Sequence, residues 1–272
     1  MRNGTNSKAV RAITAAAIVA TAPGIGAQTI WTGLERPEGL QIEAYHPELD
    51  GDVFGTLSSV VFVGGRLEAS PGFALVADLP LAYADVETAF ENTSDLAVGA
   101  PYLGVEWARA NRVIEVGVRA PIASENFGAV LGTLAEFVDR PGSFSSNAVV
   151  VTATGAYGGT SGDGFVHRIR LGPRVLIPTE GGDTEFIVDY GGVIGYATPE
   201  FGIEGGLTGW ILATEDFDGG IGERTVHQVG FKAYRPLSNG GQLGVLLRLP
   251  LDEDARQVQD FSVGVISTIA LR

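Results

Sequence analysis

The sequence has no cysteine, one methionine and only three histidines among its 272 residues. Without cysteine it can form neither a disulfide bond nor a thiolate metal site. The histidines His46, His167 and His227 lie far apart, and no two of them have the spacing of metal ligands. We therefore expect no metal ion, no cofactor and no enzymatic activity.

Positive charge is scarce as well. The chain carries 18 Lys and Arg against 32 Asp and Glu, which gives a formal net charge of −14. Such a chain repels phosphate groups, so nucleic acid is not an expected partner.

Long hydrophobic runs are missing, although 45% of the residues are hydrophobic. The longest run near the start, residues 15–22, is shorter than the ~20 apolar residues that span a bilayer as a helix. Three basic residues precede it, and a stretch of small residues ending at Ala27 follows it. This pattern is typical of a cleaved secretory signal peptide. It predicts a signal peptide over residues 1–27 and one mature domain over residues 28–272.

Helical periodicity is nearly absent after residue 30. Instead, apolar residues alternate with small or polar residues, and clusters of Gly, Asp, Asn and Pro interrupt the alternation. Twelve segments of this kind are predicted as strands: 38–46, 57–69, 72–85, 96–109, 112–123, 147–158, 165–178, 184–197, 201–214, 223–236, 241–251 and 259–271.

The two faces of these strands differ in a way that indicates a membrane. In residues 112–123, Ile114 and Val116 share one face, whereas Glu115 lies on the other. The charged face is rich in Gly, Ala and Thr, which suits a polar lumen, and the apolar face suits lipid. A soluble secreted β-protein also alternates, and it remains an alternative.

The lengths of the connections alternate too. Short turns, such as Ser70-Pro71 and Ala110-Asn111, contrast with longer acidic loops, such as Glu180 to Asp183 and Asp252 to Asp254. Outer-membrane barrels have short periplasmic turns and long outer loops. The sequence thus predicts an all-β fold: an antiparallel up-and-down transmembrane barrel of about twelve strands in the cell outer membrane, with the lipid bilayer as its partner.

Four odd-numbered segments carry a proline at the end that leads into a long loop, namely Pro80, Pro121, Pro178 and Pro250. Proline cannot donate a hydrogen bond to a strand neighbour, so we expect a strand end or an irregularity at each one.

The longest outer loop, from Glu125 to Ser146, has helical spacing of apolar residues up to Arg140-Pro141-Gly142. It predicts one short amphipathic helix. The helix either folds into the lumen as a constriction or caps the rim of the barrel.

Charged residues on the inward face are the candidate functional residues. They are predicted to line the lumen and to set its selectivity: Arg66, Glu68, Asp78, Glu106, Glu115, Arg119, Arg168, Arg170, Arg174, Glu185, Asp189, Glu204, Lys232 and Arg248. Opposed charges can select solutes in a pore. Equally, they can pair as salt bridges that fill and stiffen a narrow lumen.

Two other kinds of chemistry are weak candidates. Twelve-stranded outer-membrane phospholipases exist, but Ser238 falls in a predicted periplasmic turn and not on the outer wall beside a histidine. The acidic stretch Asp216 to Gly220, followed by Glu223, is similar to a calcium loop, although acidic outer loops produce such spacings by chance.

The stretch Gly99-Ala100-Pro101-Tyr102-Leu103-Gly104-Val105-Glu106 is the most distinctive. It resembles a strand of a family of outer-membrane barrels assigned to transport in the meta-pathway of phenol degradation, and so do the Arg-x-Pro strand ends. The resemblance implies a transport barrel for small, aromatic or hydrophobic compounds, and it assigns no binding residue. One departure is the end of the chain, Ile269-Ala270-Leu271-Arg272, where such barrels usually end in an aromatic residue.

Two functions follow from these patterns. The first is a channel or transporter for small solutes. The alternative is a structural or surface-interaction barrel with a plugged lumen and acidic, cation-binding outer loops.

Overall fold

The computed structural model describes residues 29–33, 38–49, 58–87, 92–214 and 224–271. The predicted signal peptide and its cleavage site lie outside these residues. The described residues form thirteen strand segments: β1 (Gly39–Leu49), β2 (Ser59–Ser70), β3 (Phe73–Glu87), β4 (Asn92–Val98), β5 (Tyr102–Arg109), β6 (Arg112–Arg119), β7 (Ala148–Thr160), β8 (Phe165–Pro178), β9 (Glu185–Ala197), β10 (Gly202–Leu212), β11 (Thr225–Pro236), β12 (Gln242–Pro250) and β13 (Gln259–Ala270).

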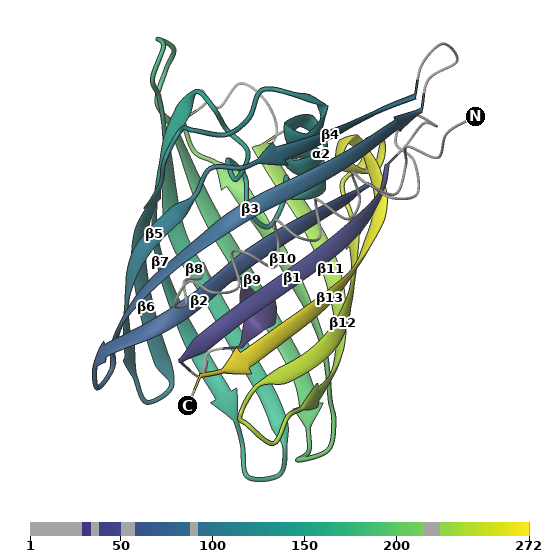
Figure 1. Cartoon of the computed structure of the whole chain (residues 1–272). Coiled ribbons are helices and arrows are strands. Elements are labelled where there is room, and N and C mark those ends of the chain that lie inside the picture. Colours follow the sequence, from purple (N-terminus) through teal and green to yellow (C-terminus); the bar gives the residue numbers. More distant parts are fainter. Residues whose placement is uncertain (1–28, 34–37, 50–57, 88–91, 215–223, 272) are drawn as a thin grey trace.

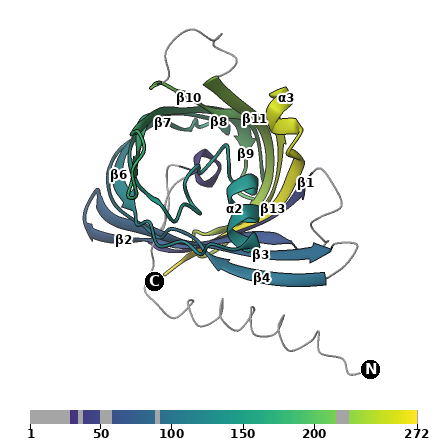
Figure 2. The same ribbon diagram turned by 90° about the horizontal axis from the view of Figure 1, so that it is seen from above.

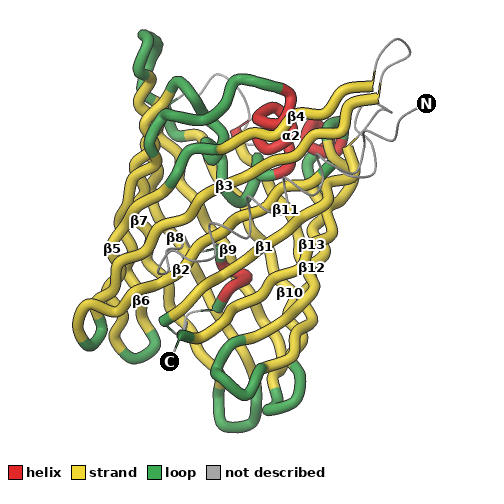
Figure 3. The backbone as a smooth tube through the Cα atoms, viewed as in Figure 1, coloured by secondary structure: helices red, strands yellow, loops and turns green. Residues whose placement is uncertain are grey.

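The segments close into one antiparallel barrel (Figures 1 and 3). Strands that follow one another in the sequence pair, except that β3 pairs with both β4 and β5. The barrel closes where β1 pairs with β13, so that Gly39 faces Ala270 and Tyr45 faces Gly264. Because β4 and β5 occupy one place in the wall, the barrel has twelve strands. The predicted all-β, twelve-stranded, up-and-down barrel is confirmed.

The exterior of the wall is apolar. Leu103, Ile169 and Ile194 are each more than 60% exposed, and similar side chains recur around the barrel. The alternate positions point inward, where Glu115 and Arg119 are at most 5% exposed. A wall with an apolar outer band and a polar interior is the architecture of a transmembrane β-barrel.

One predicted strand is broken. Residues 96–109 form two segments, because Gly99, Ala100 and Pro101 leave the ladder between β4 and β5. β3 pairs with β5 through its first half and with β4 through its second half. Pro80 lies between the two halves, where its carbonyl accepts a 2.8 Å hydrogen bond from the Gly99 N–H.

The expectation that Pro80 ends a strand is therefore wrong, since β3 continues to Glu87. Pro80 is tolerated inside β3 because the partner strand changes at that point, so no ladder donor is needed there. The other three prolines behave as predicted: β8 and β12 end at Pro178 and Pro250, and Pro121 follows the end of β6.

The predicted helix of the long loop is present as α2 (Phe127–Ala135). The Asn126 side chain caps its first turn by accepting a hydrogen bond from the Ala129 N–H. Leu131 is fully buried, and α2 packs against β3 and β4. Two further short segments are described, a 3-10 turn η1 (Ile30–Thr32) and a four-residue helix α3 (Glu253–Arg256).

The view along the barrel axis shows α2 and η1 within the outline of the wall (Figure 2). None of the helices in the described part of the chain is long and apolar enough to cross a lipid bilayer.

Candidate functional site: the plugged lumen

Two segments distant in the sequence meet inside the barrel. One is η1, which precedes the first strand, and the other is the stretch of residues 136–144, which follows α2. We call them together the lumen plug. Trp31 is completely buried, and it belongs to one apolar cluster with Leu131 of α2 and Phe144 of the plug. Residues 136–144 of the long loop thus lie inside the barrel, while α2 itself packs against β3 and β4.

Side chains of the wall hold η1 by donating hydrogen bonds to the backbone carbonyl groups of η1. Arg168 Nε donates a 3.2 Å hydrogen bond to the Ile30 carbonyl, and Lys232 Nζ donates a 2.6 Å bond to the Trp31 carbonyl. Both donors come from inward positions of the wall, on β8 and β11. Hydrogen bonds with a charged donor are the stronger ones, so two wall cations fix the position of this short turn.

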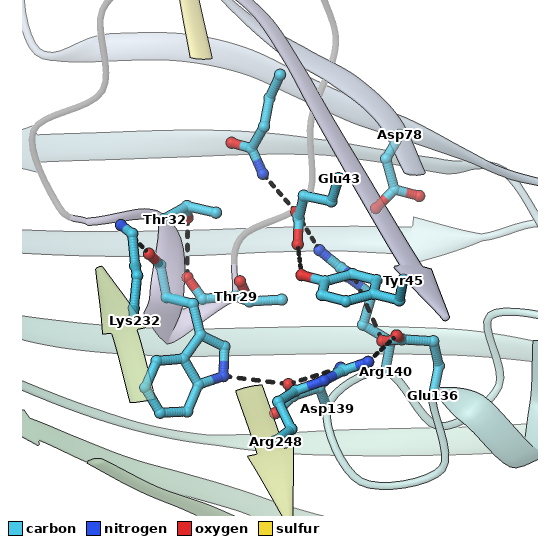
Figure 4. Close-up of polar contacts among 12 residues, drawn as sticks. Thr29, Thr32, Glu43, Tyr45, Asp78, Glu136, Asp139, Arg140, Lys232 and Arg248 are labelled. Carbon is cyan, nitrogen blue, oxygen red and sulfur yellow. Dashed lines mark hydrogen bonds and ion pairs between the residues drawn. The ribbon is translucent and has the colours of Figure 1, made fainter. Parts of the chain in front are cut away.

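Asp139 is the junction between the two parts of the plug (Figure 4). Its carboxylate accepts hydrogen bonds from Trp31 Nε1 at 3.2 Å and from Thr208 Oγ1 at 2.9 Å. It also pairs with Arg248 at 3.1 Å. One side chain therefore joins η1, the long loop, β10 and β12.

A second group of charges lies beside it (Figure 4). Arg248 pairs with Glu136 at 2.8 Å, and Arg140 bridges Glu136 and Glu43 of β1. The Tyr45 hydroxyl donates to Glu43. All these side chains are nearly inaccessible to solvent, so each charge depends on its partners for stability.

Aromatic rings complete this group. The guanidinium of Arg248 stacks 4.0 Å from the ring centre of Tyr45, and that of Arg140 lies 3.8 Å from the ring centre of Phe62. Burial raises the pKa of the Glu136 carboxyl above its ordinary value, while the neighbouring Arg248 and Arg140 act in the opposite direction.

Most of the charged residues predicted to line the lumen are buried. Four pairs join neighbouring or next-neighbouring strands of the wall: Arg66–Glu106 at 2.7 Å, Arg119–Asp78 at 2.7 Å, Arg168–Glu204 at 2.5 Å and Arg174–Asp189 at 3.0 Å. Lys232 lies 4.0 Å from Glu204. The wall thus carries charges of both signs that largely satisfy one another.

The remaining predicted residues differ from this pattern. Glu115 accepts a hydrogen bond from the Tyr102 hydroxyl at 2.8 Å, and Arg170 borders a small cavity beside η1. Glu68 and Glu185 are exposed at the two rims and do not belong to the buried set. Both residues lie near the ends of their strands, on β2 and β9.

The lumen plug separates two larger cavities. The long-loop cavity, about 510 Å³, opens between α2, β10, β12 and α3. The short-turn cavity, about 310 Å³, is lined mainly by polar side chains, among them Arg168, Glu204 and Lys232. Between them a cavity of about 20 Å³ borders Ile30, Asp139 and Arg174, which is room for about one water molecule.

The sequence did not reveal the plug residues Trp31, Glu136, Asp139 and Arg140. They lie outside the strands, where no alternation assigns a side to them. For Glu43 a signal was available: Gln41, Glu43 and Tyr45 follow the inward parity of the first strand.

The acidic outer loops are described only in part. The calcium-like stretch at residues 216–223 lies outside the described residues. Within the residues that the structure does describe, no group of three or more His, Asp or Glu side chains is arranged to hold a metal ion. The three histidines occupy separate places, and His227 pairs with Asp252 at 3.0 Å.

The sequence was compared with protein families and with curated proteins, and neither comparison gave a match. Solved structures with a similar fold do exist. The fold is similar to an outer membrane channel from Pseudomonas putida F1, with a TM-score of 0.54 and 14% identity over 89% of this chain and 98% of that one.

It is also similar to the NanC porin, with a TM-score of 0.51 and 9% identity over 85% of this chain and all of that one. A third similar structure is the translocator domain of the autotransporter NalP from Neisseria meningitidis, with a TM-score of 0.51 and 11% identity over 98% of both chains. At these identities the likeness establishes the fold, which is that of outer-membrane β-barrels.

Proposed function

We propose that this protein is an outer-membrane channel for small solutes and that the lumen plug closes it at rest. The long-loop end then faces the cell exterior and the short-turn end faces the periplasm. The observation that carries the proposal is the pair of cavities of about 510 and 310 Å³ on opposite sides of one plug. A solute that enters from either side reaches the plug before any part of the wall has to move.

The way in which the plug is held supports this function. The wall is closed by the backbone hydrogen bonds of the strands, and these do not involve the plug. The plug is held mainly by side-chain contacts such as Trp31–Asp139 and Lys232–Trp31, together with a backbone bond from the Ala100 N–H, outside the strands, to the Ser143 carbonyl. Such contacts can exchange for water without opening the ladder, so the plug can move while the barrel stays folded.

The two cavities also indicate a class of solute. Phe137, Val138 and Trp210 give the long-loop cavity an apolar lining, whereas charged residues line the short-turn cavity. A route of this kind suits small molecules with an aromatic or aliphatic body and a polar group. The outer-membrane channel from Pseudomonas putida F1 with a similar fold is in keeping with a channel function.

Planar-bilayer recordings of the full chain test the proposal. We expect low or intermittent conductance for the wild type and a larger steady conductance for Trp31→Ala, because Trp31 is the largest fully buried side chain of η1. Trp107→Ala is the matched control, since Trp107 is 47% exposed on the outer wall. Fractionation of cells and a heat-modifiable gel shift establish localisation and folding beforehand.

A second candidate function is a closed barrel that acts at the cell surface. The pairing of Arg248 favours it, because this buried side chain contacts Glu136, Asp139 and Ser262 at once and thereby anchors the plug to the wall. If both folded proteins, wild type and Trp31→Ala, conduct no ions, the channel proposal is wrong and the closed barrel is favoured.

A further inference from the structure

The long-loop cavity has a fixed aromatic floor. The rings of Phe137 and Trp210 meet edge to face, with centroids 5.3 Å apart. Trp210 Nε1 donates a 3.0 Å hydrogen bond to the Phe137 carbonyl. The polar edge of the indole is therefore already bonded, and both rings are held in place before any ligand arrives. Leu134, Val138 and Val258 extend the apolar surface.

The rim of the same cavity is acidic. Asp252, Glu253 and Asp254 line it where β12 leads into α3. Among the described residues that line the cavity there is no lysine, arginine or histidine. Asp252 turns toward His227 and accepts from both its ring and its backbone N–H. Glu253 and Asp254 are exposed, so they supply the negative charge at the opening.

We propose that the long-loop cavity binds small organic cations that carry an aromatic or alkyl body, such as aryl-ammonium ions. The apolar body packs against Phe137 and Trp210, and the ring faces attract the cationic group. Glu253 and Asp254 attract it further from the rim. The volume of about 510 Å³ is in the range of small-molecule binding sites.

The charge of the rim decides the ligand class. A neutral aromatic compound gains the apolar contacts but not the attraction of the carboxylates, and an aromatic anion is repelled by them. Binding at this site does not require conduction, so a barrel that conducts no ions can still bind the cation.

Isothermal titration calorimetry of the full chain, folded in a neutral detergent, tests the inference. Three probes share a benzyl or phenyl group and differ in charge: benzyltrimethylammonium, benzyl alcohol and benzoate. We expect saturable binding of the cation, binding about tenfold or more weaker for the alcohol, and no binding of benzoate. Empty micelles give the background for each probe.

Two variants assign the binding to the cavity. Phe137→Ala removes part of the aromatic floor and should weaken the cation about tenfold. The double variant Glu253→Gln/Asp254→Asn should weaken the cation and leave the alcohol unchanged. Its matched control is Glu180→Gln/Asp183→Asn, which removes the same charge from another exposed loop and should leave cation binding unchanged.

Several results would overturn the inference. They are the absence of cation binding by the folded wild type, equal affinity for benzoate, or affinities unchanged in both cavity variants. An equal loss in the Glu180 and Asp183 control would also overturn it, because the acidic surface as a whole would then attract the cation.

Discussion

Trp31 Nε1 donates a 3.2 Å hydrogen bond to Asp139 Oδ2 across the lumen, although 108 residues separate them in the chain. This bond joins the segment that precedes the first strand to the longest loop of the barrel. The same carboxylate also bonds to Thr208 and Arg248 on the wall. The plug is therefore one connected unit.

Asp139→Ala should lower the free energy of unfolding by about 3 kcal/mol, because it leaves buried donors of Trp31 and Arg248 without an acceptor. Urea unfolding followed by tryptophan fluorescence measures the change. Asp163→Ala is the control, since Asp163 lies exposed in the turn between β7 and β8, and we expect little change there. Equal stability of the two variants would show that Asp139 does not anchor the plug.

Gly230→Ala should displace the plug without removing any polar contact. A Cβ atom at this inward position of β11 would lie 2.5 Å from the Trp31 ring, which is closer than real contacts allow. We expect an increased conductance in planar bilayers with an unchanged heat-modifiable gel shift. Gly205→Ala on β10 is the control, because its Cβ would meet nothing closer than the Phe231 ring, at 3.5 Å. A wild-type conductance for Gly230→Ala would mean that Trp31 does not block the lumen.

Acidification should increase the conductance of the barrel. Burial raises the pKa of Glu136, so this carboxyl takes up a proton at a higher pH than an exposed glutamate does. Once protonated, it no longer forms ion pairs with Arg248 and Arg140. Conductance should therefore rise as the pH is lowered, at a higher pH than an exposed glutamate would give, and this step should be absent in Glu136→Gln. The exposed Glu253→Gln variant should retain it, and a step that persists in Glu136→Gln would assign it to other groups.

A charge placed on the lipid-facing surface should destabilise the barrel, and the cost should depend on its depth in the membrane. Val265 lies near the middle of β13 and is 47% exposed, so Val265→Arg places a charge in the hydrocarbon layer and should cost about 2–4 kcal/mol. Leu271, just beyond the short-turn end of β13, is equally apolar, and Leu271→Arg should cost at most about 1 kcal/mol. Unfolding from lipid vesicles compares the two. Similar costs would place the membrane boundary elsewhere.

The sequence was sufficient to predict the wall, because a lipid-facing surface forces strict alternation along every strand. Ile114 and Glu115 show this most clearly, since their opposite orientation followed from the pattern alone. The break between β4 and β5 was missed, although Pro101, which cannot donate to a ladder, was a signal for it. The change of partner along β3, from β5 to β4, could not be read from the sequence.

The plug could not be predicted in the same way. Trp31 and Asp139 have no periodic neighbours, and their positions depend on contacts with strands far along the chain. The alternation along each strand predicted which charged residues lie on the inward face of the wall. It could not predict their ion pairs, because alternation tells which face a residue is on and not which residue it contacts. Arg168 and Glu204, for example, are joined only once β8 and β10 flank β9 in the finished wall.

The contact between η1 and β11 has a consequence for the order of assembly. The carbonyl of Trp31 accepts its hydrogen bond from Lys232, 201 residues later. Other anchors of η1 also come from later parts of the chain. Arg168 on β8 donates to the Ile30 carbonyl, and Asp139, which accepts from the Trp31 ring, pairs with Arg248 on β12. Contacts at such separation form late, since loop closure must precede them. Until β12 and β13 have joined the wall, Asp139 lacks Arg248 as its partner, so the plug cannot complete its contacts before the wall is nearly whole.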